Sequence, residues 1–242
     1  MLINRYQTLV AAQQLLRKAG LNVTRASNTL DRKRAFFFRK NQIDLVIDVG
    51  ANVGQYARRL RRAGYTGRII SFEPLKPEFT KLFHASKEDP SWDCHNVALG
   101  RANTEMVINV SWDSVSSSLL RASEDYVRAI PKGATMSQET VAVRQLDSFK
   151  DHLLKSTEVV HLKLDVQGYE MEVLLGAEGF LQRVQSIESE MSLMHLYENQ
   201  PLVAELVRYL DARGFTLVWL ERLFVDPGSG HLWQVDGIFL KR

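Results

Sequence analysis

A short apolar run that ends in a glycine turn constrains the fold of this chain more than any other feature. Residues 45–49 read LVIDV, residues 50–54 read GANVG, and a helical pattern follows at residues 55–63. A nearly continuous aliphatic run of this length is typical of a strand buried on both faces of a parallel sheet. Glycines in the turn let the backbone approach a ligand, and the start of a helix offers unpaired N–H groups. The segment therefore predicts a strand, a ligand-binding turn and a helix.

Strand–helix alternation continues along much of the remaining chain. Helical patterns begin at Pro77, Tyr169 and Pro201, the last with Asn199 as a candidate cap. The segment DPGSG near the C-terminus has turn composition, so the strands on either side of it can pair as an antiparallel hairpin. The pattern predicts an α/β fold with a doubly wound, seven-stranded, Rossmann-like sheet whose last strand is antiparallel. Its strands are expected at residues 45–49, 68–72, 92–99, 159–164, 184–190, 215–220 and 235–240.

Two segments depart from this alternation. Residues 1–41 are expected to form an N-terminal helical extension, with a helix at 4–19 and three consecutive phenylalanines at 36–38. We expect these aromatic rings to join the core, with a lid or an interface as alternatives. Residues 101–145 alternate polar and apolar side chains and are expected to form a β-rich insertion or lid within a single domain at 42–242.

Composition excludes several classes of protein. The chain has 242 residues, of which 45% are hydrophobic and 24% charged, which is typical of a globular protein rather than a disordered or coiled-coil one. The single cysteine, Cys94, excludes an intramolecular disulfide and a cysteine-rich metal site. Apolar runs are much shorter than the about 20 residues that a membrane span needs, and residues 1–20 lack the apolar centre of a signal peptide. We expect a cytoplasmic protein.

Basic residues are concentrated at the front of the chain. Residues 1–68 contain 14 Lys and Arg but three Asp and Glu, whereas the whole chain carries a formal net charge of +3. These cations can be solvated helix faces, or they can meet an anionic surface through peripheral membrane contact. Aromatic residues are not interleaved with the cations as base stacking requires, so no nucleic-acid partner is expected. A non-catalytic module that binds an anionic surface is therefore one alternative function.

An acid at the end of the second expected strand indicates the class of ligand. Glu73 lies 23 residues after Gly50, where a carboxylate can hydrogen-bond both hydroxyls of a ribose. The turn lacks the second glycine of the G-x-G-x-x-G dinucleotide motif and the lysine of a phosphate-binding loop. The sulfonium of S-adenosylmethionine is cationic and tolerates Asp48 beside the turn, so this cofactor is preferred over NAD. An NAD(P)-dependent oxidoreductase on a similar sheet is the other alternative.

Six short blocks of sequence are specific in combination: DVGANVGQY at 48–56, FEP at 72–74, NVALG at 96–100, SSL at 117–119, KLDVQGYE at 163–170 and DGIF at 236–239. Together they resemble the FkbM family of S-adenosylmethionine-dependent methyltransferases over roughly residues 42–240. The resemblance implies a methyltransferase domain at 42–242. It also implies O-methylation of a hydroxyl on a sugar, a glycan or a glycosylated or polyketide metabolite.

The resemblance also implies roles for individual residues. Gly50, Asn52 and Gly54 would shape the methionine and ribose pocket. Glu73 would bind the ribose hydroxyls, and the 96–98 segment would lie near the adenine. The whole set implied to bind the cofactor comprises Asp48, Gly50, Ala51, Asn52, Gly54, Tyr56, Glu73, Pro74, Asn96, Ala98 and Asp165.

Methyl transfer to a hydroxyl requires activation of the hydroxyl oxygen, because a neutral alcohol is a poor nucleophile. A general base or a metal ion can provide it. Asp165, after the fourth strand, is the first candidate base, Glu190 at the end of the fifth strand is the second, and His195 is the third. Asp165 and Glu190 could instead share a proton or hold a divalent ion such as Mg²⁺ through their oxygen atoms. The sequence leaves these alternatives open.

Overall fold

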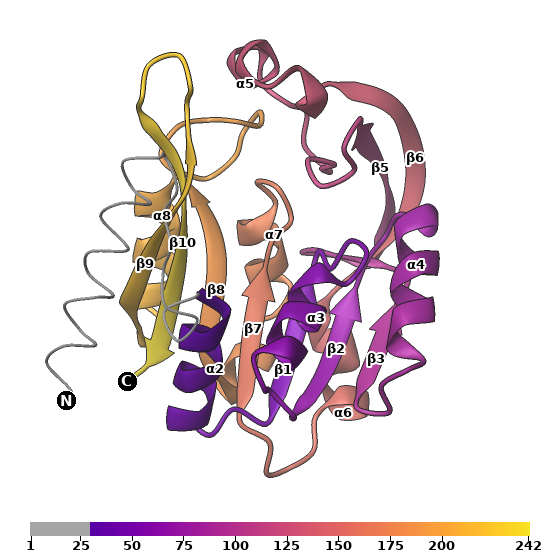
Figure 1. The fold of residues 1–242 in the computed structure, drawn as a ribbon, viewed down its shortest axis with the longest axis vertical. Coiled ribbons are helices and arrows are strands. Elements are labelled where there is room, and N and C mark those ends of the chain that lie inside the picture. The colour runs from indigo at the N-terminus through magenta and orange to yellow at the C-terminus, as the bar shows by residue number, and fades with distance from the viewer. Residues whose placement is uncertain (1–29) are drawn as a thin grey trace, which may run out of the picture.

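The computed structural model describes residues 30–242, and Figure 1 shows them arranged around a seven-stranded sheet. The helix expected at residues 4–19 lies outside the described residues. In space the strands follow the order β3-β2-β1-β7-β8-β10-β9. The bounds are β1 (Leu45–Val49), β2 (Arg68–Phe72), β3 (Trp92–His95), β7 (Val160–Leu164), β8 (Val184–Ser192), β9 (Phe215–Val225) and β10 (Leu232–Lys241).

The strand directions confirm the fold class predicted from the sequence. Strands β3, β2, β1, β7 and β8 are parallel to one another, whereas β10 lies between β8 and β9 and is antiparallel to both. The order of the strands along the chain reverses between β1 and β7. In open α/β sheets, ligands bind in the crevice that forms at such a switch point, outside the carboxyl ends of the strands.

Helices cover both faces of the sheet (Figure 1). Because side chains alternate along a strand, β1 sends Val46 to one face and Ile47 to the other. The helices are α2 (Leu30–Lys40), α3 (Gln55–Arg62), α4 (Lys76–Ser86), α5 (Glu124–Ala129), α6 (Lys150–Leu153), α7 (Glu170–Leu175) and α8 (Val203–Asp211), with 3₁₀ turns at Pro131–Gly133, Leu146–Phe149 and Phe180–Arg183.

The face that receives Val46 packs against α2, α3 and α4 through Phe38, Leu60 and Leu82. The opposite face packs against α6, α7 and α8. The expectation that all three phenylalanines join the core is correct for Phe38, which is fully buried, and wrong for Phe36, which is 61% exposed. Successive residues of a helix point in different directions, so α2 cannot bury all three rings against one sheet.

The segment after β3 builds a second, three-stranded sheet with the order β4-β6-β5. Its strands are β4 (Ala98–Leu99), β5 (Thr104–Ser111) and β6 (Thr135–Arg144). Together with α5, it forms an arch above the carboxyl ends of the main sheet (Figure 1). The single strand expected at 92–99 is therefore wrong, because Asn96 leaves the main sheet. Its amide donates hydrogen bonds to the carbonyls of Glu73 and Pro74, both at 2.9 Å.

Several boundaries also differ from the prediction. Strand β8 continues to Ser192, so Glu190 lies inside the strand instead of at its end. Helix α8 begins at Val203 rather than at Pro201, and the cap is Leu202, whose N–H donates to the Glu205 carboxylate at 2.8 Å. Among residues 30–242, no helix has the length and apolar character of a membrane span.

Candidate functional site

A cavity of about 390 Å³ lies at the carboxyl ends of the strands, lined by residues of the main sheet and of the arch. The turn after β1, the ends of β2 and β7, strand β8 and strand β10 contribute to its wall. The loop at 114–118 closes it from the arch side. The cavity therefore occupies the switch point that the strand order predicts.

The β1–α3 turn brings its backbone against the loop that follows β7. Gly50 has a φ of 81°, and a Cβ at this position would overlap the carbonyl oxygen of Asp165. Only glycine combines this conformation with such close contact. Gly54 has a φ of 82° but does not line the cavity, because it packs against the ring of Trp92. Ala51 and Asn52, which lie between the two glycines, line the cavity.

The carboxylate of Glu73 fixes the end of β2 against the same turn. It accepts the N–H groups of Asn52 at 2.8 Å and Leu75 at 2.9 Å. Burial raises the pKa of Glu73 to about 7, although these two hydrogen bonds favour the ionised form. Glu73 and Pro74 both line the cavity.

The residues predicted to lie near adenine separate into two groups. Ala98 lines the cavity together with its neighbours Val97 and Leu99, which are also buried. Asn96 is not part of the cavity wall and instead supports the end of β2. The wall at this point is thus apolar.

Asp48 lies in the cavity wall at the base of the turn. Its side chain is buried, and Ser71 Oγ donates to it at 3.3 Å. Burial raises its pKa to about 6, whereas the positive charge of Lys163 acts in the opposite direction. A nearby cationic ligand group would favour the ionised form.

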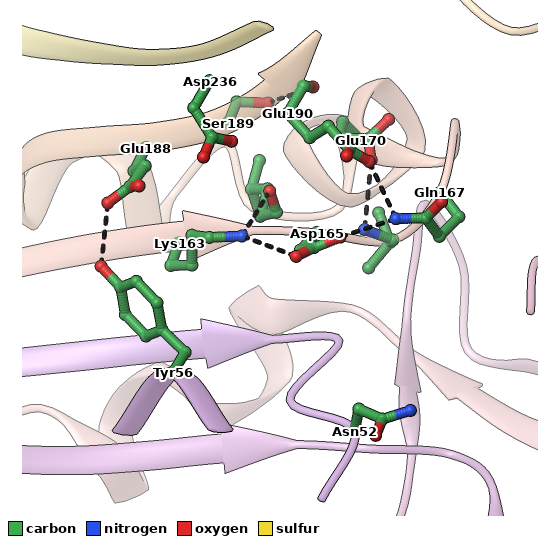
Figure 2. A network of polar contacts seen from close by, with 12 residues as sticks. Asn52, Tyr56, Lys163, Asp165, Gln167, Glu170, Glu188, Ser189, Glu190 and Asp236 are labelled. Carbon is green, nitrogen blue, oxygen red and sulfur yellow. Dashed lines mark hydrogen bonds and ion pairs between the residues drawn. The ribbon is translucent and has the colours of Figure 1, made fainter. Parts of the chain in front are cut away.

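Two carboxylates from neighbouring strands are joined by one amide, as Figure 2 shows. Gln167 Nε2 lies 2.8 Å from Asp165 Oδ1 and 2.8 Å from Glu190 Oε2. Lys163 Nζ lies 3.1 Å from the other oxygen of Asp165. The Asp165 side chain is 42% exposed, whereas Glu190 is buried. Burial and the charge of Asp165 raise the pKa of Glu190 well above its usual range.

The same contacts test whether Asp165 and Glu190 could hold Mg²⁺, one of the alternatives that the sequence left open. The Lys163 ammonium lies 3.1 Å from Asp165 and already balances the charge that would attract a cation, and the Gln167 amide donates to both carboxylates. The described residues contain no cluster of three or more His, Cys, Asp or Glu side chains that could hold a metal ion. The donor set around Asp165 and Glu190 therefore does not fit Mg²⁺.

A hydrogen-bonded chain connects this pair of acids to the arch. Gln167 Oε1 lies 2.9 Å from the hydroxyl of Tyr197, which also lies 3.1 Å from the carbonyl of Ser116. Tyr126 donates to Ser116 Oγ at 3.1 Å. Gln167 has a φ of 55°, a conformation that costs a non-glycine residue about 1–3 kcal/mol. Contacts on both sides of its amide offset this strain.

His195 lies away from these groups. It is exposed, its Nδ1 is 3.0 Å from the carbonyl of Gln200, and it does not line the cavity. The geometry therefore does not support it as a base for a ligand bound in the cavity.

A buried ionic network beneath the cavity was not predicted from the sequence. Arg34 of α2 donates from Nε to Glu188 at 2.7 Å and from Nη2 to Asp236 at 3.2 Å. The Tyr56 hydroxyl, in the set predicted to bind cofactor, instead donates to Glu188 at 2.8 Å, although the residue lines the cavity. A charged residue inside a buried strand, such as Glu188 or Lys163, needs a partner of opposite charge. The charged residues in these strands were therefore the sequence feature from which the network could be predicted.

A sequence model of the FkbM methyltransferase domain matches residues 48–217. The chain belongs to the FkbM methyltransferase family. This membership confirms the resemblance predicted from the sequence. It lends no support to either alternative function, the NAD(P)-dependent oxidoreductase or the non-catalytic module.

Individual relatives of this FkbM-family chain are distant. Methyltransferase 1 of Beauveria bassiana (strain ARSEF 2860) is 26% identical over 145 residues, which cover 55% of this chain and 58% of that protein. The chain thus matches less than two thirds of the length of this curated relative.

Similar solved structures include several methyltransferases. The magnesium protoporphyrin IX methyltransferase of Synechocystis PCC 6803, with bound SAM, has a TM-score of 0.48 and 9% identity, covering 88% of this chain and 78% of that one. The 1,6-didemethyltoxoflavin-N1-methyltransferase of Burkholderia thailandensis has a TM-score of 0.45 and 12% identity, covering 97% and 86%.

Proposed function

We propose that this FkbM-family enzyme transfers the methyl group of S-adenosylmethionine to a hydroxyl of a sugar, a glycan or a glycosylated or polyketide metabolite, with Asp165 as the general base. One observation carries the proposal. The Asp165 carboxylate is accessible in the cavity and is held from two sides by Lys163 and Gln167, and the main chain of Asp165 lies against Gly50 of the turn.

The proposed cofactor site uses the turn and the end of β2. Glu73 would accept hydrogen bonds from the ribose hydroxyls, because each of its oxygens retains a lone pair beyond the backbone bond that it accepts. Gly50, Ala51 and Asn52 would pass their backbone along the methionine portion. Ala98 would pack against the adenine, and Asp48 would lie on the side of the cationic sulfur.

Chemistry at the acceptor follows from the charges around it. S-adenosylmethionine, when bound, supplies a methyl group on a positively charged sulfur. Asp165 would take the proton of the acceptor hydroxyl as its oxygen bonds to the methyl carbon and the bond between that carbon and sulfur breaks, with S-adenosylhomocysteine as the leaving group. The raised pKa of Glu190 favours its protonated form, which can donate a hydrogen bond to a second oxygen of the acceptor.

The floor of the cavity supports a polyhydroxylated acceptor. Side chains with oxygen lone pairs and amide N–H groups gather there, namely Asp165, Gln167, Glu190, Gln234 and Asp236. Hydroxyl groups both donate and accept, so a sugar ring can satisfy carboxylates and amides at once. A purely apolar acceptor would leave these groups unpaired.

The test is transfer of radiolabelled methyl groups from S-adenosylmethionine to a panel of hydroxylated acceptors. We expect an alkali-stable product, because methyl ethers resist the base that hydrolyses methyl esters. The Asp165→Asn variant should lower kcat by about 10²–10⁴-fold while cofactor affinity, measured by calorimetry, stays within about threefold. Asp151→Asn, an exposed aspartate on α6, is the matched control. Full turnover by Asp165→Asn, or an alkali-labile product, would overturn the proposal.

A further inference from the structure

A second hollow lies on the outer side of α2, away from the acceptor cavity. This groove of about 700 Å³ runs between α2, the end of α3 and strand β9. We call it the α2–β9 groove. It is lined by Arg32, Lys33, Phe36, Phe37, Arg39, Lys40, Ala63 and Trp219.

Aromatic side chains form the apolar part of the α2–β9 groove. Phe36 is 61% exposed at the middle of the helix, and Phe37 and Trp219 are half-buried beside it. Lys33 Nζ lies 5.8 Å from the centre of the Trp219 ring. A large phenylalanine left in water in the middle of a helix has no role in the core, which α2 reaches through Phe38 on its opposite side.

Cations flank the aromatic centre at both ends of α2. Arg32 and Lys33 precede Phe36, Arg39 and Lys40 follow it, and all four are exposed. None of the described residues that line the groove is acidic. Two acids lie nearby. Asp31 faces Arg34 at 3.7 Å and Arg59 at 3.8 Å, and Glu221 lines a small hollow next to Trp219. The described lining of the groove itself presents four cations and no acid around an apolar centre.

The charge pattern identifies the kind of partner. An aromatic ring between cations suits the boundary of an anionic bilayer, where the ring enters the acyl region and the cations meet lipid phosphates. The chain's own first 29 residues contain four basic and no acidic residues, so they do not complement the groove by charge. We propose that the α2–β9 groove docks this enzyme on the surface of an anionic lipid bilayer.

The test is co-sedimentation of the full chain with vesicles of phosphatidylcholine alone or of an equal mixture with phosphatidylglycerol. We expect binding to the mixed vesicles that weakens as salt screens the cations. Phe36→Ser should weaken this binding at least about tenfold, because it removes the side chain that enters the bilayer. Phe83→Ser on α4, where Phe83 is 41% exposed beside Lys87, is the matched control and should bind as the wild type does.

Each outcome separates this proposal from its rivals. Cofactor affinity measured by calorimetry shows whether each variant is folded, and it is independent of vesicle binding. Equal binding to neutral and anionic vesicles, or undiminished binding by Phe36→Ser, would overturn the proposal. Two other results would also overturn it, if the wild type does not bind vesicles. One is that the wild type captures an RNA oligonucleotide and Phe36→Ser does not. The other is that the wild type forms a dimer and Phe36→Ser does not. Methyl transfer to soluble acceptors tests the proposed function separately.

Discussion

Replacing Arg34 by methionine tests the buried network beneath the cavity. Arg34 is the cation within hydrogen-bonding distance of Glu188, whose side chain is fully buried, and its own side chain is 9% exposed. Methionine preserves much of the apolar length of arginine but cannot pair with the carboxylate. Removing one partner of a buried ion pair destabilises a protein by about 3–5 kcal/mol, because the other charge stays buried. For a domain of this size, that loss lowers Tm by about 6–20 °C.

The cost should depend on pH in a defined direction. Burial alone would raise the pKa of Glu188, but the adjacent His161 and Arg34 outweigh burial and hold it well below its usual range. In the wild type this carboxylate therefore contributes stability at neutral pH, which is lost as acid approaches the lowered pKa. Without Arg34, burial dominates and the pKa rises, so the folded variant takes up a proton on mild acidification. The stability difference between wild type and variant should be smaller at about pH 5 than at about pH 7.

Urea unfolding at these two pH values measures the difference. Arg34→Met combined with Glu188→Gln should recover more than half of the lost free energy, because neither charge is then buried alone. Arg39→Met, on the exposed side of the same helix, should stay within about 0.5 kcal/mol of the wild type. A loss under about 1 kcal/mol in Arg34→Met, or one that does not change with pH, would refute the reasoning.

Two further predictions concern the cavity. Cofactor affinity should rise about tenfold from about pH 6 to pH 8. The reason is that Glu73, with a pKa of about 7, must lose its proton before it can accept hydrogen bonds from both ribose hydroxyls. Calorimetry checks this, and Glu73→Gln should bind weakly at every pH; a flat wild-type profile would contradict the role. Gln167→Met removes both amide donors to the acids and should lower kcat at least about tenfold with unchanged cofactor affinity. The matched control is Gln138→Met on β6, outside the cavity wall, and equal kcat values in the two variants would argue against the bridge.

Local patterns predict the first half of the sheet well. Strands β1 and β2 begin and end at the expected residues, because each is a short apolar run closed by a turn or by an acid and a proline. The turn at Gly50 and the acid at Glu73 follow from the same patterns, and the structure brings both to one cavity. These features depend on interactions between residues close together in the chain, or on the fixed geometry of parallel strands.

Long-range contacts explain what the sequence did not predict. Arg34 and Glu188 form an ion pair although they are 154 residues apart in the sequence. The local sequence pattern of α2 does not predict this partner. The strand expected at 92–99 divides at Asn96, because its amide bonds to carbonyls at the end of another strand. The sequence placed Gln167 in one of the blocks that carry the family resemblance, without predicting a contact for it. Its bridge between Asp165 and Glu190 depends on the packing of neighbouring strands.

The close contact at Gly50 has a consequence for the distance over which the methyl group travels. The turn proposed to hold the donor and the loop that carries Asp165 meet main chain to main chain, without a side chain between them. The main chain has no rotamers. The distance between the turn at Gly50 and the loop of Asp165 is therefore fixed by direct main-chain contact and not by a side chain. A misplacement of about 1 Å can cost 10²-fold in rate. Acceptors of different sizes must therefore be accommodated by the arch, on the opposite side of the cavity, while this spacing stays constant.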